Sequence, residues 1–418
     1  MPPLDAPPRA LPARSPLGEH WALDPATVYL NHGSFGACPK PVLAEQQRLR
    51  ALMEADGVKW FVELLPGHTD RARAALAAFV NCPAEDLVFV PNATTGVTTV
   101  LENLARHLRP GDEIISTAHE YPACMNNLRR IAARAGAGVV PVPIALPVDS
   151  PDEIAAAILR AVTPRTRIAL LSHVTSPSAL ILPLGQLVPE LESRGIATVV
   201  DGAHAAGFVP LDIAGLSPSF YTGNCHKWLC TPKGSAFLYI RRERQKDFRP
   251  LVLSNSAEKP VTGRKHLHTE FDYIGTDDFT ARLCIPEAIR FLGSLLPGGW
   301  PENMAVNHAL VRRARATLCE RLGVASAAPE SMIGSMATIW LPPHDTDRHA
   351  RLMARPTRYH DALQDALLIK HHIQVPVWAA PGEAARAIRI SAQLYNAWEE
   401  YEYLADALAA ELELERRM

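Results

Sequence analysis

The amino-acid sequence predicts an α/β fold that consists of a large domain with a mostly parallel sheet and a smaller α+β C-terminal domain. Short runs of apolar, β-branched residues alternate with alanine-rich helical stretches from about residue 87 to residue 200. This alternation is typical of parallel strands that are joined by crossover helices. Beyond about residue 285 the expected helices become longer, which indicates a second domain.

The alternation starts at an apolar run after residue 86, and a helical stretch comes after most of the later runs. The expected strands are Leu87–Val90, Glu113–Ser116, Val139–Val142, Ile168–Leu171, Ala197–Val200 and Ser235–Ile240. The expected helices are Thr95–Leu108, Ala123–Ala135, Pro151–Val162 and Gly185–Arg194. The third of these helices begins with a proline, which suits the first position of a helix.

The domain organisation is inferred from these changes in pattern. Residues 1–20 carry six prolines and are expected to form a poorly ordered N-terminal arm. The large domain is expected over residues 21–284 and the small C-terminal domain over residues 285–418. The small domain should contain the helices Glu302–Leu322 and Asp361–Leu368 and the strands Ala337–Leu341 and Ala387–Ile390.

Composition and charge exclude several classes of protein. The 418 residues carry a formal net charge of −2, which gives no reason to expect nucleic acid or an anionic membrane as a partner. No apolar run approaches the ~18 residues of a membrane-spanning helix, and the proline-rich start lacks the apolar core of a signal peptide. The seven cysteines are scattered and odd in number, which favours reduced thiols. We therefore expect a cytoplasmic protein.

Two sequence features come after expected strands and carry groups that bind ligands. Asn92-Ala93-Thr94-Thr95-Gly96 opens a helix, where free backbone N–H groups and hydroxyls suit a phosphate. A simple N-cap is the alternative interpretation of this segment. Asp201 ends the strand that begins at Ala197, at the edge where α/β sheets bind ligands. Its carboxylate could pair with a cationic ring nitrogen, or it could only cap a helix or form a turn.

Two cationic residues lie further along the chain. Lys227 has apolar and aromatic neighbours in Asn224-Cys225-His226-Lys227-Trp228, and such partial desolvation makes an amine nucleophilic. A surface lysine is the alternative. Arg389 interrupts a short apolar strand, where a charge needs a partner. A substrate carboxylate would provide one through two hydrogen bonds, and a structural salt bridge is the alternative.

The combination of these four features is more specific than any one of them. A phosphate cup at a helix terminus, a strand-end aspartate, a lysine and a distal arginine form the layout that pyridoxal 5′-phosphate (PLP) needs. The lysine would hold the cofactor as a Schiff base, and the aspartate would keep the pyridine nitrogen protonated.

On these residues the sequence resembles the class V aminotransferase superfamily of fold type I PLP enzymes, which includes cysteine desulfurases and isopenicillin-N-epimerase-like enzymes. The resemblance extends from about Tyr29 to about Trp398. It implies a large domain with a mostly parallel seven-stranded sheet, and a homodimer with shared active sites.

The resemblance also implies roles for individual residues. Those implied for cofactor binding are Thr94, Thr95, Tyr121, Ser176, Asp201, His204, Asn224, His226, Lys227 and Thr276. Among them, Tyr121 would stack on the pyridine ring, and Thr276 would reach the phosphate of a neighbouring subunit. Arg389 resembles the arginine that binds the substrate carboxylate. Tyr29-Leu30-Asn31-His32-Gly33-Ser34-Phe35-Gly36 resembles the segment that lines the substrate pocket of epimerase-type enzymes, which implies substrate binding by Asn31, His32 and Gly33.

One departure from the family concerns sulfur chemistry. Cysteine desulfurases carry a sulfur-accepting cysteine on a loop shortly before the carboxylate-binding arginine, and the segment 370–377 contains no cysteine here. Persulfide formation is therefore not expected. A metal site is not expected either, because His266, His268, Glu270 and the acidic residues after them show no metal-binding spacing.

The function that these observations predict is that of a PLP-dependent enzyme acting at the α- or β-carbon of an amino acid, through a Schiff base and a quinonoid. Lys227, Tyr121 and Asp201 are the expected catalytic residues. An isopenicillin-N-epimerase-like epimerase ranks first because of the resemblance, and in that reaction Tyr121 could reprotonate the face opposite Lys227. A C–S β-elimination lyase ranks second and an aminotransferase third. A non-catalytic PLP-fold binding protein is disfavoured, because Lys227, Asp201 and Arg389 are all present.

Overall fold

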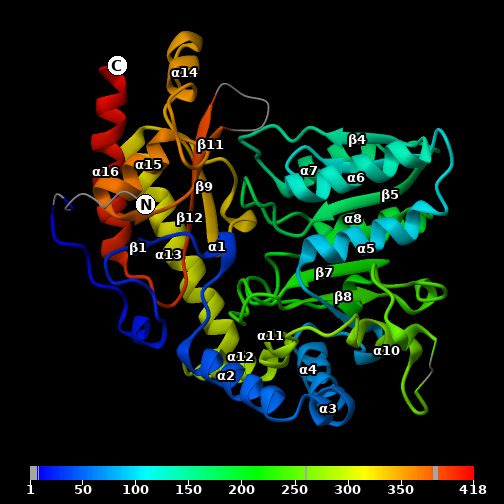
Figure 1. Ribbon diagram of the computed structural model, residues 1–418. Coiled ribbons are helices and arrows are strands. Elements are labelled where there is room, and N and C mark those ends of the chain that lie inside the picture. The colour runs from blue at the N-terminus through cyan, green and yellow to red at the C-terminus, as the bar shows by residue number, and fades with distance from the viewer. Residues whose placement is uncertain (1–6, 8, 259–260, 380–384) are drawn as a thin grey trace.

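A mostly parallel seven-stranded sheet forms the centre of the larger part of the chain (Figure 1). The computed structural model describes residues 7, 9–258, 261–379 and 385–418. The strand order is β2-β8-β7-β6-β5-β3-β4; β8 runs antiparallel to both its neighbours and the other pairs are parallel. The strands are β2 (Leu87–Val90), β3 (Glu113–Thr117), β4 (Gly138–Val142), β5 (Thr166–Ser172), β6 (Ala197–Asp201), β7 (Phe220–Asn224) and β8 (Ala236–Ile240). The expected fold class is confirmed.

The crossover helices of this sheet form where the alternation predicted them. They are α5 (Ala93–Ala105), α6 (Pro122–Ala135), α7 (Pro151–Arg160) and α8 (Leu184–Ser193). Each differs from the expected range by three residues or fewer at either end. Helix α6 shows why the ends are well defined: Pro122 occupies its first turn, and Gly136 ends it in the left-handed conformation at φ 69°.

The sequence pattern did not predict several elements of the larger part. Strand β7 was missed because only two apolar residues start it and three polar or small residues complete it, although all five are buried. Further helices lie before β2, between β6 and β7, and after β8. They are α1 (His32–Phe35), α2 (Lys40–Ala55), α3 (Gly57–Lys59), α4 (Leu65–Phe79), α9 (Ile213–Leu216), α10 (His266–Asp272), α11 (Thr280–Leu283) and α12 (Ile285–Gly293).

The C-terminal part combines a small antiparallel sheet with long helices, as expected for an α+β unit. Its three strands lie in the order β11-β12-β9. The elements are α13 (Gly299–Leu322), β9 (Met336–Trp340), α14 (Thr346–Met353), α15 (Ala362–His371), β10 (Ile373–Gln374), β11 (Val377–Ala379), β12 (Arg386–Ser391) and α16 (Trp398–Arg416). Figure 1 shows this part beside the larger sheet.

The N-terminal segment packs against the C-terminal part. Strand β1 (Val28–Tyr29) pairs in parallel with β10. Before it, Pro16–His20 forms a 3₁₀-helix, and the guanidinium of Arg14 donates to the carbonyls of Leu23, Asp24 and Thr27. From Arg14 onward, the segment expected to form an N-terminal arm is therefore held by hydrogen bonds to the residues that follow it. Residues 1–6 and 8 of that arm lie outside the described residues.

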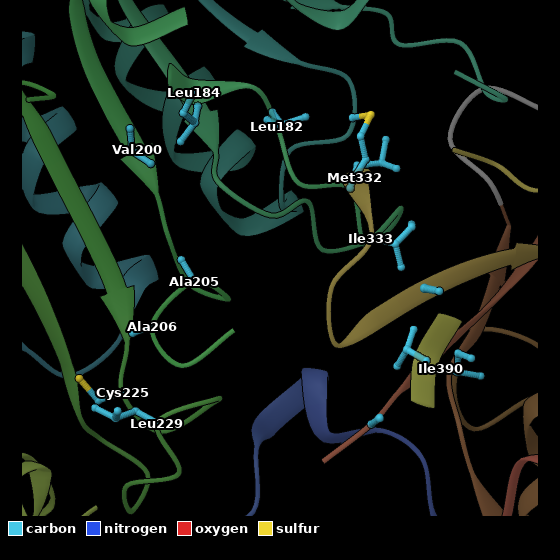
Figure 2. Packing of buried hydrophobic residues seen from close by; sticks show 14 of the residues in the cluster. Leu182, Leu184, Val200, Ala205, Ala206, Cys225, Leu229, Met332, Ile333 and Ile390 are labelled. Carbon is cyan, nitrogen blue, oxygen red and sulfur yellow. The ribbon is translucent and has the colours of Figure 1, made fainter. Parts of the chain in front are cut away.

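One hydrophobic core joins the two parts of the chain. The same cluster of buried residues contains Val200 of β6 and Ile390 of β12. Figure 2 shows Leu182, which comes after β5, near Met332, which precedes β9. The backbone N–H of Ile181 also donates to the carbonyl of Met332. The boundary between the parts is thus packed with apolar side chains.

Two further observations concern the chain as a whole. All seven cysteines are free thiols in the structure. Among the residues that the structure describes, none of the helices has the length and apolar character that crossing a membrane requires.

Candidate active site

A cavity opens at the carboxyl ends of β6 and β7, beside the first turn of α5. Its location is a consequence of the fold, because loops after parallel strands meet at one edge of the sheet. The cavity brings together most of the predicted site residues with several others. It is lined by Ser34, Phe35, Asn92, Ala93, Thr94, Tyr121, Ser172, Val174, Ser176, Asp201, Ala203, His204, Asn224, His226 and Lys227.

The first turn of α5 forms one wall of the cavity. Asn92 caps the helix, because its Oδ1 accepts from the Thr95 backbone N–H at 2.8 Å and from the Thr95 hydroxyl at 3.1 Å. Asn224 Oδ1 accepts from the Ala93 N–H at 2.8 Å. Thr94 thus faces the cavity while the Thr95 side chain completes the cap. Both interpretations of the segment, a helix cap and a polar cup, describe parts of this arrangement.

The helix approaches the sheet closely because Gly96 has no side chain. A Cβ at this position would lie 2.2 Å from Thr222 Oγ1 on β7. A similar constraint holds at Gly36, which has φ +69° and where a Cβ would lie 2.2 Å from the carbonyl oxygen of His226. These two glycines let α5 and the N-terminal segment pack directly against the elements that carry the site.

A buried acidic group lies on the sheet side of the cavity. Asp201 Oδ1 accepts from the Ala203 N–H at 2.9 Å, and Oδ2 accepts from the Cys124 thiol at 3.2 Å. Burial raises the pKa of Asp201. A cationic partner would favour the ionised carboxylate, so the site is suited to a protonated ring nitrogen.

Glu120 is a second buried carboxyl group here, and sequence reasoning missed it. Its Oε1 accepts from the Tyr121 N–H at 2.8 Å and from the Ser172 hydroxyl at 2.9 Å. Within the described part of the chain, Oε2 is buried without a hydrogen-bond partner. Burial and the nearby charge of Asp201 raise the pKa of Glu120. Glu120, Cys124 and Asp201 have ligand atoms within 4.8 Å of one another. The only signal for Glu120 in the sequence is its position directly before Tyr121.

Lys227 extends into the cavity from the turn after β7. Its Nζ lies 2.9 Å from His204 Nε2. Burial and the nearby Arg389 lower the pKa of Lys227 from 10.5 to about 7. A large fraction of the amine is therefore neutral at neutral pH, which is the form that reacts as a nucleophile or accepts a proton.

Arg389 lies just behind the cavity wall on β12 and is 2% exposed. Its guanidinium donates to the Ser176 carbonyl at 2.6 Å and to the Ser34 hydroxyl at 3.1 Å. It forms no ion pair with any residue that the structure describes, whereas Arg386 on the opposite face of the same strand pairs with Asp361 at 3.1 Å. A structural salt bridge was the alternative interpretation of Arg389, and the described contacts do not contain one.

The N-terminal segment contributes other residues than the sequence predicted. Ser34 and Phe35 line the cavity. Asn31, His32 and Gly33 lie behind them: Asn31 accepts from the Ser34 hydroxyl at 2.6 Å, His32 Nε2 contacts the Lys227 carbonyl at 3.0 Å, and the Gly33 N–H donates to Ser391. This segment therefore supports the Lys227 turn. Its substrate-binding role remains a prediction, with Ser34 and Phe35 nearest the cavity.

Two other predicted residues differ in their placement. Ser176 lines the cavity and accepts a hydrogen bond from Arg389 through its carbonyl, so it links the cavity wall to Arg389. Thr276 is not a lining residue of the cavity; its hydroxyl contacts the Tyr273 hydroxyl at 2.9 Å on the exposed loop after α10. Its role in a neighbouring subunit remains a prediction.

The donor set of the cavity fits PLP. A phosphate would find Thr94 and the N-terminus of α5, with His226 beside them; His226 Nδ1 bonds the Ser235 carbonyl at 3.0 Å, so its other ring nitrogen is left for a ligand. Asp201 provides an anion for a ring nitrogen, and Lys227 provides an amine.

Comparison with known proteins agrees with this interpretation. The family model of class V aminotransferases matches residues 39–404. Isopenicillin N epimerase of Amycolatopsis lactamdurans is 34% identical over 93% of this chain and 96% of its own length. Putative L-cysteine desulfhydrase 1 of Oryza sativa subsp. japonica is 31% identical over 91% of this chain and 82% of its own.

A solved structure shares the fold. The cystine C–S lyase C-DES, in complex with its reaction product cysteine persulfide, superposes with a TM-score of 0.74 at 22% identity, over 92% of this chain and 97% of that one. The match of the family model over most of the chain, together with the two relatives above 30% identity, shows that the protein belongs to the class V aminotransferase family of PLP-dependent enzymes.

Proposed function

We propose that the protein is an amino-acid epimerase that uses PLP to invert the α-carbon of its substrate. The observation that carries the proposal is the buried Arg389 guanidinium, which has no carboxylate partner in the described part of the chain and lies beside the cavity that holds Lys227. A buried charge needs a counter-charge. The α-carboxylate of an amino acid would supply it and would bring the α-carbon toward the Lys227 amine.

The residues of the cavity would hold the cofactor at three points. Thr94, Asn224 and His226 surround the expected phosphate end, Asp201 would pair with the ring nitrogen, and Lys227 would bind the cofactor covalently. When bound, PLP supplies a carbonyl carbon that condenses with amines and a cationic ring that accepts the electrons of a bond broken at the α-carbon.

The chain's own residues would then move the proton. Arg389 would bind the carboxylate bidentately, with Ser176 and Ser34 fixing the guanidinium. The neutral Lys227 amine would remove the α-proton on its own face. Tyr121 lines the cavity, is 43% exposed and interacts electrostatically with Arg389. Its hydroxyl would return a proton on the opposite face, which gives the inverted enantiomer.

A C–S lyase is the second candidate. It is favoured by the relatives named as L-cysteine desulfhydrases, which match more than nine-tenths of this chain. Such a reaction needs the same α-proton removal by Lys227, followed by departure of a sulfur leaving group. None of the residues that line the cavity is a cysteine, so a sulfur-accepting thiol is not part of this candidate. An aminotransferase ranks third. In that reaction the proton taken from the α-carbon would go to the cofactor carbon.

An incubation in deuterated water distinguishes these reactions. An epimerase should place deuterium at the α-carbon of both enantiomers, as proton NMR and chiral chromatography can measure. Tyr121→Phe should reduce inversion by about 100-fold or more, as expected for loss of a general acid. It should keep α-proton exchange of the starting enantiomer, because Lys227 remains.

The same assay provides a control variant and the results that would contradict the epimerase proposal. Tyr359→Phe changes an exposed tyrosine that does not line the cavity and should have no effect. If the protein releases pyruvate and ammonia from cysteine conjugates and inverts none of the amino acids tested, the proposed function is the C–S lyase and not the epimerase. Conversion of the cofactor to its amine form would favour the aminotransferase.

We further propose that the protein is a cytoplasmic homodimer with shared sites. The exposed loop that carries Thr276 is the predicted contact with the partner's phosphate. Three consecutive apolar residues, Leu251–Leu253, are 46–57% exposed before this loop, which supports an interface in this region.

A further inference from the structure

Trp228 comes directly after Lys227 and points its indole nitrogen at the ring that Lys227 contacts. The side chain is 1% exposed and packs against the rings of His32 and Phe208, with centroid distances of 4.8 Å and 4.9 Å. Its Nε1–H donates to His204 Nδ1 at 3.3 Å, while His204 Nε2 lies 2.9 Å from Lys227 Nζ. The three residues thus form a chain of hydrogen bonds.

The chemistry of these groups orients that chain in one direction. An indole nitrogen only donates, so His204 Nδ1 must carry the lone pair. The imidazole is buried, and burial together with Lys227 lowers the pKa of His204 well below 6.5, so the ring is neutral. In a neutral ring with a bare Nδ1, the proton is on Nε2. This N–H faces the Lys227 amine. If the amine were protonated, it would have no lone pair to accept this hydrogen bond, and two donors would face each other.

We propose that Trp228 is a positioning residue that fixes His204 in the Nε2–H tautomer, so that His204 donates to the Lys227 amine and keeps it unprotonated. This inference rests on the proposed function only in that Lys227 is the reactive amine. The role differs from packing, because a phenylalanine would fill the same space against His32 and Phe208 but would donate nothing.

Other titratable groups face Lys227, and replacing the indole would not remove their influence on its pKa. Besides burial itself, Arg389 on β12 lowers the pKa of the amine, whereas Asp201 on β6 and Cys124 on α6 raise it. His32 and His226 face His204 from the N-terminal segment and from the Lys227 turn. Among the described residues, none of these groups forms a hydrogen bond with His204 Nδ1, so the tautomer depends on Trp228.

The test uses the full chain after removal of its cofactor and without substrate. Competitive acetylation of Lys227 over a pH series, quantified by mass spectrometry, gives the apparent pKa of the amine. Nitrogen-15 NMR of histidine-labelled protein gives the tautomer of His204, with the signal assigned through His204→Gln. Trp228→Phe should raise the pKa of Lys227 by about one unit, which lowers the neutral fraction of the amine about tenfold at pH values well below that pKa. His204 should then populate both tautomers.

Two further variants separate this role from a structural one. A glutamine at position 204 offers an N–H donor that has no tautomer, so Trp228→Phe should cause no additional shift in the His204→Gln background. Trp300→Phe removes another indole hydrogen bond, from Nε1 to the Ile289 carbonyl, and should leave Lys227 unchanged.

The outcomes that overturn the proposal are specific. They are an unchanged Lys227 pKa in Trp228→Phe, or an equal shift in the His204→Gln background, which would indicate packing. If Trp228→Phe does not fold, the unmodified protein still decides, because an Nδ1–H signal for His204 contradicts the proposal and an Nε2–H signal supports it. Since no substrate is present, these results do not depend on which reaction the enzyme catalyses.

Discussion

Lys227 and Arg389 are two buried basic residues without an ion-pair partner among the described residues. Burial and the nearby Arg389 lower the pKa of Lys227, and burial lowers the pKa of Arg389 itself to about 10. A buried charge without a partner opposes folding. Such an arrangement is expected where a ligand supplies the missing anion.

The first prediction concerns Lys227 and the pH dependence of stability. Its pKa is 10.5 in the unfolded state and about 7 in the folded, cofactor-free chain, so between these values the unfolded state binds more protons. The free energy of unfolding should therefore rise with pH across this window, by up to about 1.4 kcal/mol per pH unit. Lys227→Met should lose this slope and be the more stable protein below pH 7.

Denaturant unfolding at pH 7.5, 8.5 and 9.5 measures the effect. Lys246→Met, which changes an exposed lysine, should keep the slope of the unmodified chain. If the free energy of unfolding depends on pH equally in Lys227→Met and in the unmodified chain, the result would contradict the burial of the amine.

The second prediction concerns Asp201. Asp201→Asn keeps an oxygen that can accept from the Ala203 N–H but removes the negative charge opposite the expected ring nitrogen. Electrostatic contributions of several kcal/mol imply that the turnover rate falls by about 100-fold to 1000-fold. Steady-state kinetics with the substrate found in the deuterium assay measure this. A rate within threefold of the unmodified enzyme would show that the reaction does not depend on this charge.

At the scale of elements, the site is built from the segments directly after three strands, β2, β6 and β7, whose carboxyl ends lie at the same edge of the sheet. The loop after β2 leads into α5, the segment after β6 carries His204 just beyond Asp201, and the turn after β7 carries Lys227. Because these segments meet at the same edge of the sheet, residues more than one hundred positions apart line one cavity. The Asn224–Ala93 hydrogen bond ties the end of β7 to the start of α5.

The third prediction concerns the cap of α5. Asn92→Ala removes the acceptor for two Thr95 donors and should lower the free energy of unfolding by about 1 kcal/mol. It should also weaken PLP binding by about tenfold, because the first turn would no longer be held in place for a phosphate. Denaturant unfolding and fluorescence titration with PLP measure the two effects.

A matched control exists in the C-terminal part. Asp345 caps α14 through its Oδ1, which accepts from the Arg348 N–H at 2.8 Å. Asp345→Ala should lose similar stability and leave PLP affinity unchanged. If Asn92→Ala and the unmodified chain bind PLP with equal affinity, the cap of α5 does not contribute to cofactor binding.

At the scale of the whole molecule, the site is completed by segments from both ends of the chain. The 3₁₀-helix at residues 16–20 and β1 pack on the C-terminal part, and α1 then brings Ser34 to Arg389. The apolar cluster shown in Figure 2 joins the larger and the C-terminal parts, so a shift of one against the other would move Arg389 relative to Lys227.

The fourth prediction concerns assembly. Analytical ultracentrifugation should give a particle of twice 45.6 kDa. Thr276→Val should weaken PLP binding several-fold in the dimer if its hydroxyl reaches the partner's phosphate, whereas Thr276→Ser should not. A fully active monomer, or equal PLP affinity in both variants, would contradict shared sites.

The sequence by itself determined the α/β class, the order of most strands and crossover helices, and the cofactor. These depend on local signals: apolar runs of four or more residues, and polar residues directly after them. Asp201, Lys227 and Thr94 could be predicted because each lies beside its own strand or helix end. The strand β7 was missed because Thr222, Gly223 and Asn224 carry no local signal for a buried strand.

Only the tertiary structure decided how the distant parts meet. The sequence contains nothing local that directs Ser34 toward Arg389, Trp228 toward His204, or β1 toward β10, because each of these contacts depends on how separately formed elements pack. The order of the N-terminal segment from Arg14 onward has the same origin, since its hydrogen bonds form only in the folded chain. Local sequence thus specified the chemical groups, and long-range packing specified which of them face one another.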